Sequence, residues 1–371
     1  MFAEKKVELI ELFYDLIYVY AISNLTKLLE TSDGSLFADL GRYLILCLVI
    51  LQGWLYLTNY VNRYGEWTPV EYLLTAVNMT ATLYMANTIS DDWQIVSSSF
   101  NLAMAFMLGC VLLMYLLQIF RKKKDPAAAR NSAAILAFVL VLYLAAFLLS
   151  HCHIHQYVLP VDVAAVLAGA FLPFLLKGKF SEEIIHFPHL CERLELITII
   201  TFGECVVGIT EYFDINQLSL SAVLVFACVL LLFGCYVLQI HRLCDHERPA
   251  RALRMMFTHY LIVLSLNLIT ITFSYAHNSE AAKIYVTGFM TAALSVFYLS
   301  LYADSTYYYD AVQFEKKDAL PAAAFLLIGI LLMQVISEKT YAILFGTFIA
   351  AGGNFLLLLK KYRSLQKGGT S

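Results

Sequence analysis

Charged residues are scarce in this sequence, and that scarcity excludes most classes of soluble protein. Only 14% of the 371 residues are Asp, Glu, Lys or Arg, whereas soluble domains carry about 25%. Apolar residues make up 60% of the chain, and the mean hydropathy is +0.71. The formal net charge of −3 offers no basic surface for nucleic acid, so we expect no nucleic-acid partner. The composition predicts a chain that crosses a lipid bilayer many times.

The sequence also lacks the short motifs of common enzymes and metal sites. It has no phosphate-binding glycine loop, no GxSxG motif and no HExxH motif. Its eight cysteines form no CxxC pair and lie mostly in apolar runs, which is typical of small packing residues. Three histidines alternate over residues 151–155 without an acidic neighbour, a weak metal signal. We therefore predict no metal, no cofactor and no catalytic residue; these absences argue against an enzyme without excluding one.

Long apolar runs are abundant, and they predict about twelve membrane-spanning helices. About 20 helical residues cross the hydrocarbon core, and only a helix or a closed barrel satisfies the backbone there. We therefore expect an all-α, polytopic membrane helical bundle whose main partner is the lipid bilayer. The predicted spans cover residues 7–29, 37–61, 69–89, 97–120, 130–150, 157–176, 189–212, 217–240, 253–275, 282–303, 319–337 and 340–360.

The basic residues predict the orientation of these spans. Of the 25 Lys and Arg residues, 21 fall at one side of the predicted bundle, and basic loops stay in the cytoplasm. An even number of spans with both termini cytoplasmic follows. The four exceptions are Lys27, Arg42, Lys283 and Lys339.

A shift of about 181 residues aligns the first four predicted spans with spans seven to ten. The shift places Glu11 on Glu192 and Gly53 on Gly234. Because six spans separate the partners, the two copies would have the same orientation. Any two apolar helices align tolerably, so coincidence is the alternative. We predict two parallel-related six-helix halves, residues 1–180 and 181–371.

Acidic residues inside the predicted spans are the strongest indication of function. A charge at the bilayer centre costs about 2.5–3.5 kcal/mol on insertion scales. Glu8, Glu11 and Asp15 are spaced by three and four residues, so they share one face of the first span. Glu204 lies near the middle of the seventh span, where a carboxylate needs a partner, a proton or water. We predict that Glu204 binds a proton or cation, with Asp15 and Glu11 forming a second site.

Arg63, at the end of the second predicted span, is the first candidate for a counter-charge. It could pair with a carboxylate near the cytoplasm, such as Asp15, Glu11 or Glu71, and so gate or balance the site. The alternative is an arginine whose head reaches the membrane surface among aromatic neighbours.

Further polar residues complete the predicted substrate- or ion-binding set. Glu192 and Arg193 lie in the first turns of the seventh span, where the helix dipole also explains acidity. Asn24 and Asn78 add polar groups to the first and third spans. His259 is either a proton relay or a buried histidine bonded to a carbonyl.

Three short segments resemble the bacterial low-temperature-requirement A family. They are Val7–Val19, which contains ELFYDL, then His189–Arg193, and then Gly203–Cys205. Family members more usually have Phe where Tyr14 stands and Ser where Cys205 stands. The resemblance implies a multi-pass protein of the bacterial cytoplasmic membrane and a link to growth in the cold. It implies no substrate, reaction or cofactor.

Three functions remain open at this point. The leading hypothesis is a secondary transporter or ion-coupled carrier for a small solute or ion, with proton-binding carboxylates on spans one and seven. The second is a membrane-embedded, lipid-modifying enzyme that uses Glu204, His186, His189 and Glu192 as acid and base groups. The third is a receptor, channel or assembly protein whose carboxylates only hold helices together. The sequence leaves open the solute and whether the chain forms a homo-oligomer.

Overall fold

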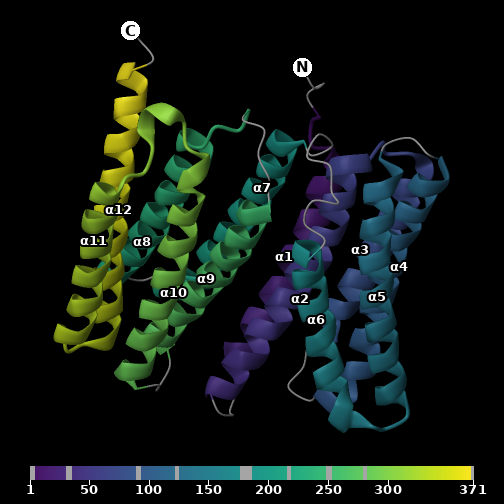
Figure 1. The fold of residues 1–371 in the computed structure, drawn as a ribbon. Helices are drawn as coiled ribbons and strands as arrows, with labels where there is room; N and C mark the ends of the chain where they lie inside the picture. The colour runs from purple at the N-terminus through teal and green to yellow at the C-terminus, as the bar shows by residue number, and fades with distance from the viewer. Residues whose placement is uncertain are drawn as a thin grey trace. The chain divides into compact units, whose positions relative to one another are not determined.

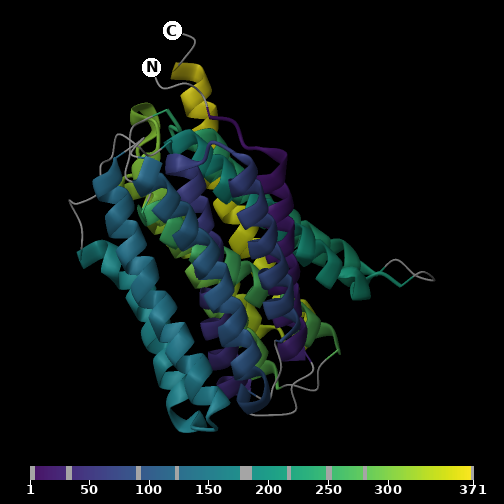
Figure 2. The ribbon, with the colours of Figure 1, turned by 90° about the vertical axis from the view of Figure 1, so that its right-hand side faces the viewer.

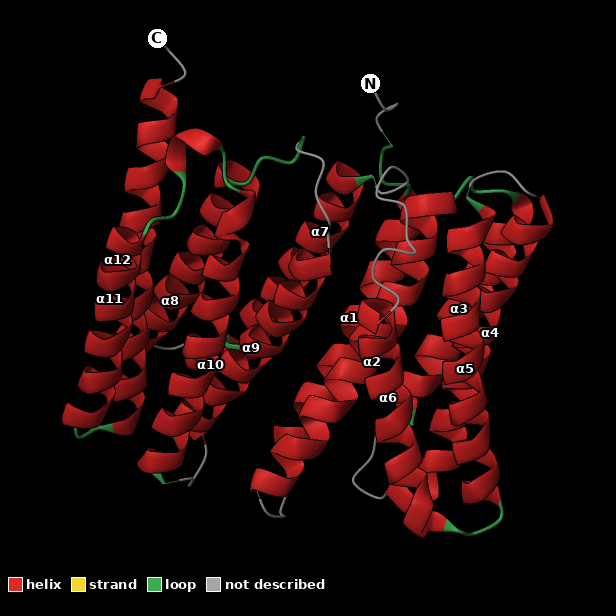
Figure 3. Ribbon diagram, viewed as in Figure 1, coloured by secondary structure: helices red, strands yellow, loops and turns green. Residues whose placement is uncertain are grey.

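The apolar runs form helices, and the polar interruptions between them form the connections. The computed structural model describes residues 5–30, 36–88, 93–121, 125–175, 186–214, 219–247, 253–278 and 282–368. Within these ranges Figure 3 shows helices and loops, and an isolated antiparallel bridge joins Cys244 to Tyr308. The described structure therefore confirms the predicted all-α class.

The chain divides into two units, Met1–Arg193 and Leu194–Ser371. In unit 1, α4 packs along α5, α5 packs along α6, and α1 contacts α2 and α3. Figures 1 and 2 show these helices side by side from two directions. Along the chain, unit 1 consists of α1 (Leu9–Glu30), α2 (Leu36–Tyr64), α3 (Pro69–Asn87), α4 (Trp93–Arg121), α5 (Pro126–His151), the 3-10 turn η1 (His155–Tyr157), α6 (Val158–Leu175) and the start of α7 (Phe187–Gly208).

Unit 2 holds the rest of α7 and five further α-helices. In it, α9 packs along α10, and α12 packs along α8 and α11. The elements after α7 are η3 (Thr210–Tyr212), α8 (Leu220–Tyr236), the π-helix η4 (Val237–Leu243), α9 (Leu253–Asn278), α10 (Lys283–Ala303), η5 (Asp304–Tyr307), η6 (Asp310–Val312), α11 (Lys316–Val335) and α12 (Lys339–Gly368).

Local signals in the sequence explain where several helices begin. Thr68 caps α3 by accepting a hydrogen bond from the Glu71 backbone, and the Glu71 side chain accepts one from the Thr68 backbone. This reciprocal capping box satisfies two of the free N–H groups at the helix start. The Asp125 side chain caps α5 by accepting a hydrogen bond from the Ala128 backbone N–H (3.0 Å). Pro69 and Pro126 follow these caps, at the first turn where a missing N–H costs nothing.

Small residues set the close packing of α11 against α12. A Cβ atom on Gly329 would overlap the backbone carbonyl of Gly346, and one on Gly353 would overlap the Phe325 ring. Membrane helices often approach through such small residues, because lipid provides little hydrophobic force to drive them together. Gly329, Gly346 and Gly353 therefore hold the hairpin of α11 and α12 together through van der Waals contact.

Nine of the helices in the described ranges are long and apolar enough to cross a membrane. They are α2, α4, α5, α6, α8 with its π-helical end, α9, α10, α11 and α12. The polar residues of α1, α3 and α7 lower the hydropathy of these three helices. The predicted multi-pass membrane bundle is therefore supported, whereas the count of twelve spans and the internal repeat stay predictions. The predicted boundary after residue 180 falls in 176–185, outside the described residues.

Gly169 on α6 lets α2 approach, and this contact generates a prediction for stability. A Cβ at Gly169 would overlap the Tyr56 hydroxyl and the Gln52 amide, and Gln52 donates a hydrogen bond to the Val166 carbonyl (3.1 Å). We expect Gly169→Ala to lower the free energy of unfolding by about 1–3 kcal/mol through overpacking. Thermal unfolding of the detergent-solubilised protein measures the change.

Gly109 provides the matched control, since it lies on α4 of the same unit and a Cβ there would meet no neighbouring atom within 4 Å. Gly109→Ala should be neutral or raise stability by up to about 1 kcal/mol, because alanine loses less backbone entropy in a helix. If the two variants unfolded at the same temperature, the close approach of α2 and α6 at Gly169 would be refuted.

Candidate functional site

Helix α1 turns its acidic face inward and its apolar face outward. Glu11 and Asp15 are buried, with exposed fractions of 1% and 0%, whereas Glu8 at the helix start is exposed. Leu9 and Phe13 on the opposite side are exposed. This inverted pattern suits a helix whose outer surface meets lipid, because the protein interior is then the place where a carboxylate finds partners.

Arg193 at the start of α7 is the partner of both carboxylates. Its Nε donates to Asp15 Oδ2 (3.1 Å) and its Nη2 donates to Asp15 Oδ1 (2.6 Å). Its Nη1 donates to Glu11 Oε2. The guanidinium is 1% exposed, so a planar fork of donors replaces water around both anions. The predicted residues Glu11, Asp15 and Arg193 therefore meet in one buried cluster within unit 1.

Helix α2 supplies the remaining contacts of Arg193 and Asp15. Trp54 Nε1 donates to Asp15 Oδ1 (2.6 Å), and the Arg193 guanidinium carbon lies 5.5 Å from the centre of the Trp54 ring, within range of a cation–π attraction. Arg193 Nη2 also donates to Thr58 Oγ1 (3.4 Å). Each anionic or cationic head is thus held from two helices.

His189, one turn before Arg193, joins the cluster in a defined tautomer. The side-chain amide of Asn62 donates to the His186 carbonyl (2.8 Å) and accepts from the His186 N–H (3.2 Å). These two backbone bonds orient the amide, so that Asn62 Nδ2 faces His189 Nδ1 at 3.2 Å. Because Nδ2 is only a donor, Nδ1 must accept. The neutral ring therefore carries its proton on Nε2, which lies 3.3 Å from Glu11 Oε2.

We call Glu11, Asp15, His189 and Arg193 the Arg193 cluster. Two ionised carboxylates, one guanidinium and one neutral imidazole give it a formal charge of −1. A buried charge without a counter-ion is unfavourable. The arrangement is therefore chemically suited to take up one proton.

Two predicted residues, Asn24 and Asn78, lie outside the cluster and link helices instead. Asn24 Nδ2 donates to the Ala86 carbonyl of α3 (3.3 Å), and Asn78 Nδ2 donates to the Met107 carbonyl of α4 (2.9 Å). Such bonds are a common means of joining membrane helices. Their ion-binding role stays a prediction.

The other predicted residues of unit 1, Arg63 and Glu192, are at least partly exposed. Arg63 is half-buried at the end of α2, and Glu192 is exposed beside buried Arg193. Their predicted roles stay predictions. The ion pairs described for Asp15 and Glu11 are made by Arg193.

Glu204 belongs to unit 2 and has a different environment. It is half-buried, and its neighbours Val206 and Val207 are exposed. Within the described ranges, no hydrogen bond or ion pair holds its carboxylate. The adjacent Cys205 is buried and accepts a hydrogen bond from Thr270 Oγ1 (2.9 Å). Glu204 is therefore a half-buried carboxylate beside exposed residues of α7, and its ion-binding role stays a prediction.

Unit 2 also buries a second acidic group, Asp304. It accepts a hydrogen bond from Thr258 Oγ1 (2.7 Å). His259 Nδ1 lies 2.8 Å from the Met255 carbonyl, so this nitrogen is the donor and His259 Nε2 accepts from the Tyr236 hydroxyl (3.1 Å). Of the two roles considered for His259, the contacts show a buried histidine bonded to a carbonyl.

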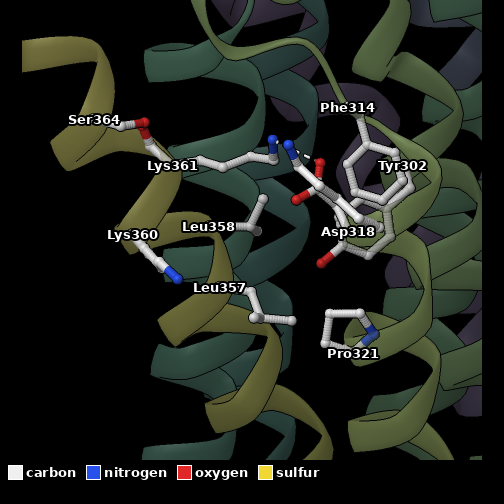
Figure 4. Close-up of a pocket in the computed structure, with 10 residues that line it drawn as sticks. Tyr302, Phe314, Asp318, Pro321, Leu357, Leu358, Lys360, Lys361 and Ser364 are labelled. Carbon is white, nitrogen blue, oxygen red and sulfur yellow. Dashed lines mark hydrogen bonds and ion pairs between the residues drawn. The ribbon is translucent and has the colours of Figure 1, made fainter. Parts of the chain in front are cut away.

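Figure 4 shows a pocket of about 420 Å³ at the ends of α10, α11 and α12 in unit 2. Lys361 and Asp318 form an ion pair of 2.8 Å at its edge, and Leu357 and Pro321 form its apolar wall. No residue that the sequence singled out for function lines this pocket. We therefore place the candidate site at the Arg193 cluster.

Some members of the site escaped the sequence reasoning. Trp54, Thr58 and Asn62 are four residues apart on α2, a spacing that puts their side chains on one helix face. This polar stripe within an apolar run is the feature of the sequence that could have identified them as site residues. The polar stripe of α2 and the acidic stripe of α1 do not indicate which helices these two faces contact. The role of Arg193 as the partner of both carboxylates is therefore visible only in the structure.

The ion pairs of Arg193 generate a second prediction. Arg193→Met leaves two buried carboxylates without a cation, and we expect a loss of about 3–5 kcal/mol in unfolding free energy. The triple change Glu11→Gln, Asp15→Asn, Arg193→Met should restore the folded protein, because it removes the charges together. Size-exclusion chromatography and thermal unfolding measure both outcomes.

Arg254→Met is the control, since Arg254 is exposed and makes a single described hydrogen bond, to Thr306 (2.9 Å). Its effect should stay within about 0.5 kcal/mol. Equal stability of Arg193→Met and Arg254→Met would contradict the pairing described above.

Comparison with known proteins identifies the family of the chain. The family model described as Bacterial low temperature requirement A protein (LtrA) matches residues 6–352. The match includes Glu11, Asp15, Arg193 and Glu204. A search of curated proteins gives no match. Because the family model covers nearly the whole chain, this multi-pass membrane protein belongs to the bacterial low temperature requirement A family.

Proposed function

We propose that the protein is a proton-coupled secondary carrier of the bacterial cytoplasmic membrane. The observation that supports this most directly is the charge of the Arg193 cluster. Asn62 presents a donor to His189 Nδ1, so His189 is neutral and the cluster is one positive charge short of balance. A proton supplies that charge.

Glu11 is the group that takes the proton in this proposal. Asp15 accepts three hydrogen bonds, two from Arg193 and one from Trp54, which favour its ionised form. Glu11 contacts the guanidinium through one nitrogen only, and it also accepts a hydrogen bond from the Glu8 backbone N–H (3.2 Å) and faces His189 Nε2 at 3.3 Å. His189 Nδ1 already accepts from Asn62, so in this proposal the added proton sits on Glu11.

Proton uptake would change how α1 holds α7. With Glu11 neutral, its ion pair with Arg193 Nη1 weakens, while the two bonds to Asp15 remain. A charge change that biases one packed element against another is the general basis of such switches. Helix α7 runs on from Arg193 to Gly208, and Glu204 lies on its later turns.

Glu204 is the second ion-binding residue of the proposal. Its support is its half-buried carboxylate, which no described hydrogen bond or ion pair holds. The alternative of a lipid-modifying enzyme has less support, because His189 is fully engaged by Asn62 and Glu11. A carrier needs a titratable group that is buried, whereas an acid or base catalyst must reach its substrate.

Proton binding can be measured without knowledge of the solute. We expect proteoliposomes on a solid-supported membrane to give a transient current after a pH jump, because a proton moves into the buried cluster. Glu11→Gln should reduce this current at least about tenfold, since the site loses its titratable group. Glu204→Gln, recorded in parallel, tests the second site.

Glu315→Gln is the control, because Glu315 is 59% exposed, and its current should equal that of the unchanged protein. A folded Glu11→Gln variant that keeps the full current would remove Glu11 from the proposed role. If the unchanged protein gave no more current than empty liposomes, the carrier proposal would be lost in favour of a receptor or assembly protein.

The proposed orientation, with both termini in the cytoplasm, is tested by Cys152. This residue follows α5 and is exposed, whereas the seven other cysteines are buried. For Cys244, outside the predicted spans, burial and the nearby Asp304 carboxylate raise the pKa of the thiol, which keeps it unreactive. We expect a membrane-impermeant maleimide to label intact cells through Cys152, as mass measurement would show. Labelling of Cys152 that requires permeabilised cells would reverse the orientation. The Cys152→Ser variant should not be labelled, which checks that no other cysteine reacts.

A further inference from the structure

Asp162 on α6 is a buried carboxylate that the Arg193 cluster does not explain. It is 4% exposed, and within the described ranges neither of its oxygens has a hydrogen-bond partner. No described ion pair includes it. Most buried carboxylates in proteins are paired or bind a metal ion, so this one indicates a missing ligand.

The neighbouring helices of unit 1 point further unpartnered polar atoms toward the same region. Asn101 on α4 is close enough for its amide to interact with the Asp162 carboxylate, although no hydrogen bond of normal geometry joins them. Tyr143 on α5 lies within electrostatic reach of both Asp162 and Tyr56. The two amide atoms of Asn101, the Tyr143 and Tyr56 hydroxyls, and Gln52 Oε1 are all buried without a hydrogen bond inside the described part of the chain.

The packing of α6 explains why these groups converge. Residues 162, 166 and 169 are spaced by four and three, so they share one face of α6. Gln52 of α2 donates to the Val166 carbonyl (3.1 Å), and Gly169 makes room for Tyr56. Helices α4 and α5 pack along each other and α5 packs along α6, as Figures 1 and 2 show. The polar atoms therefore come from four neighbouring helices of unit 1 and lie along the same face of α6.

The chemistry of these atoms selects the ligand. Six of the seven unpartnered atoms are oxygens, and the group carries a single negative charge. Hard oxygen donors suit alkali and alkaline-earth cations. A divalent ion would leave an excess positive charge beside one carboxylate, whereas a monovalent ion balances it. A proton on Asp162 would neutralise the charge but give a donor to only one of the remaining acceptors.

We propose that Asp162, Asn101, Tyr143, Tyr56 and Gln52 form a binding site for a monovalent alkali cation of the size of sodium. This site shares no residue with the Arg193 cluster. Its existence does not depend on the proposed carrier function, because binding can be measured at equilibrium without transport.

The test uses the full chain, purified in detergent, with ²²Na⁺ as the probe in a scintillation proximity assay. The unchanged protein should show saturable binding that unlabelled NaCl displaces and choline chloride does not. Asp162→Asn should weaken binding at least about tenfold, equivalent to about 1.4 kcal/mol or more. Tyr143→Phe keeps the ring and removes one oxygen, so a decrease of several-fold is expected in a folded protein.

Asp310→Asn is the matched control, because Asp310 is exposed in unit 2, and its binding should be unchanged. Thermal unfolding provides a second readout: NaCl should stabilise the unchanged protein relative to choline chloride at equal ionic strength, and Asp162→Asn should abolish the difference. Absence of saturable ²²Na⁺ binding in the unchanged protein, or full binding in both Asp162→Asn and Tyr143→Phe, would overturn the site. Glu11→Gln should retain ²²Na⁺ binding, which separates this test from that of the carrier proposal.

Discussion

The burial of Arg193 between Glu11 and Asp15 is the interaction on which the organisation of unit 1 depends. Lipid offers no water to charged groups, so each must find its partner inside the bundle. The guanidinium meets both carboxylates, and Trp54 and Thr58 complete its shell. This requirement fixes the rotation of α1, whose acidic face turns inward. It also joins α1 and α2 to the start of α7, since Asp15 and Arg193 are 178 residues apart in sequence.

Unit 1 buries carboxylates in two different environments. The carboxylates of the Arg193 cluster are neutralised largely by a side chain of the protein. The carboxylate of Asp162 and the nearby polar groups of Asn101 and Tyr143 are buried without a described hydrogen bond. The first arrangement holds helices together and leaves a deficit of one positive charge. The second leaves a set of oxygen acceptors, the ligand type that a hard cation prefers.

Tautomers assigned from the hydrogen-bond network decide what each histidine can do. Asn62 is oriented by two bonds to the backbone of His186, and it thereby makes His189 a donor toward Glu11. In unit 2, the Met255 carbonyl makes His259 Nε2 an acceptor from Tyr236. The same residue type thus serves one site beside an ion pair and another in a neutral chain of hydrogen bonds.

The sequence by itself determined the membrane class, the helical structure and the identity of the acidic stripe on α1, because apolar run length and the spacing of Glu11 and Asp15 are local properties. It also identified Arg193 as a residue of interest, yet assigned the counter-charge to Arg63. Only the tertiary structure decided that Arg193 meets both carboxylates and that Asp162 lacks a partner. Helical periodicity states which residues share a face, whereas the helix that this face contacts depends on how the whole bundle packs.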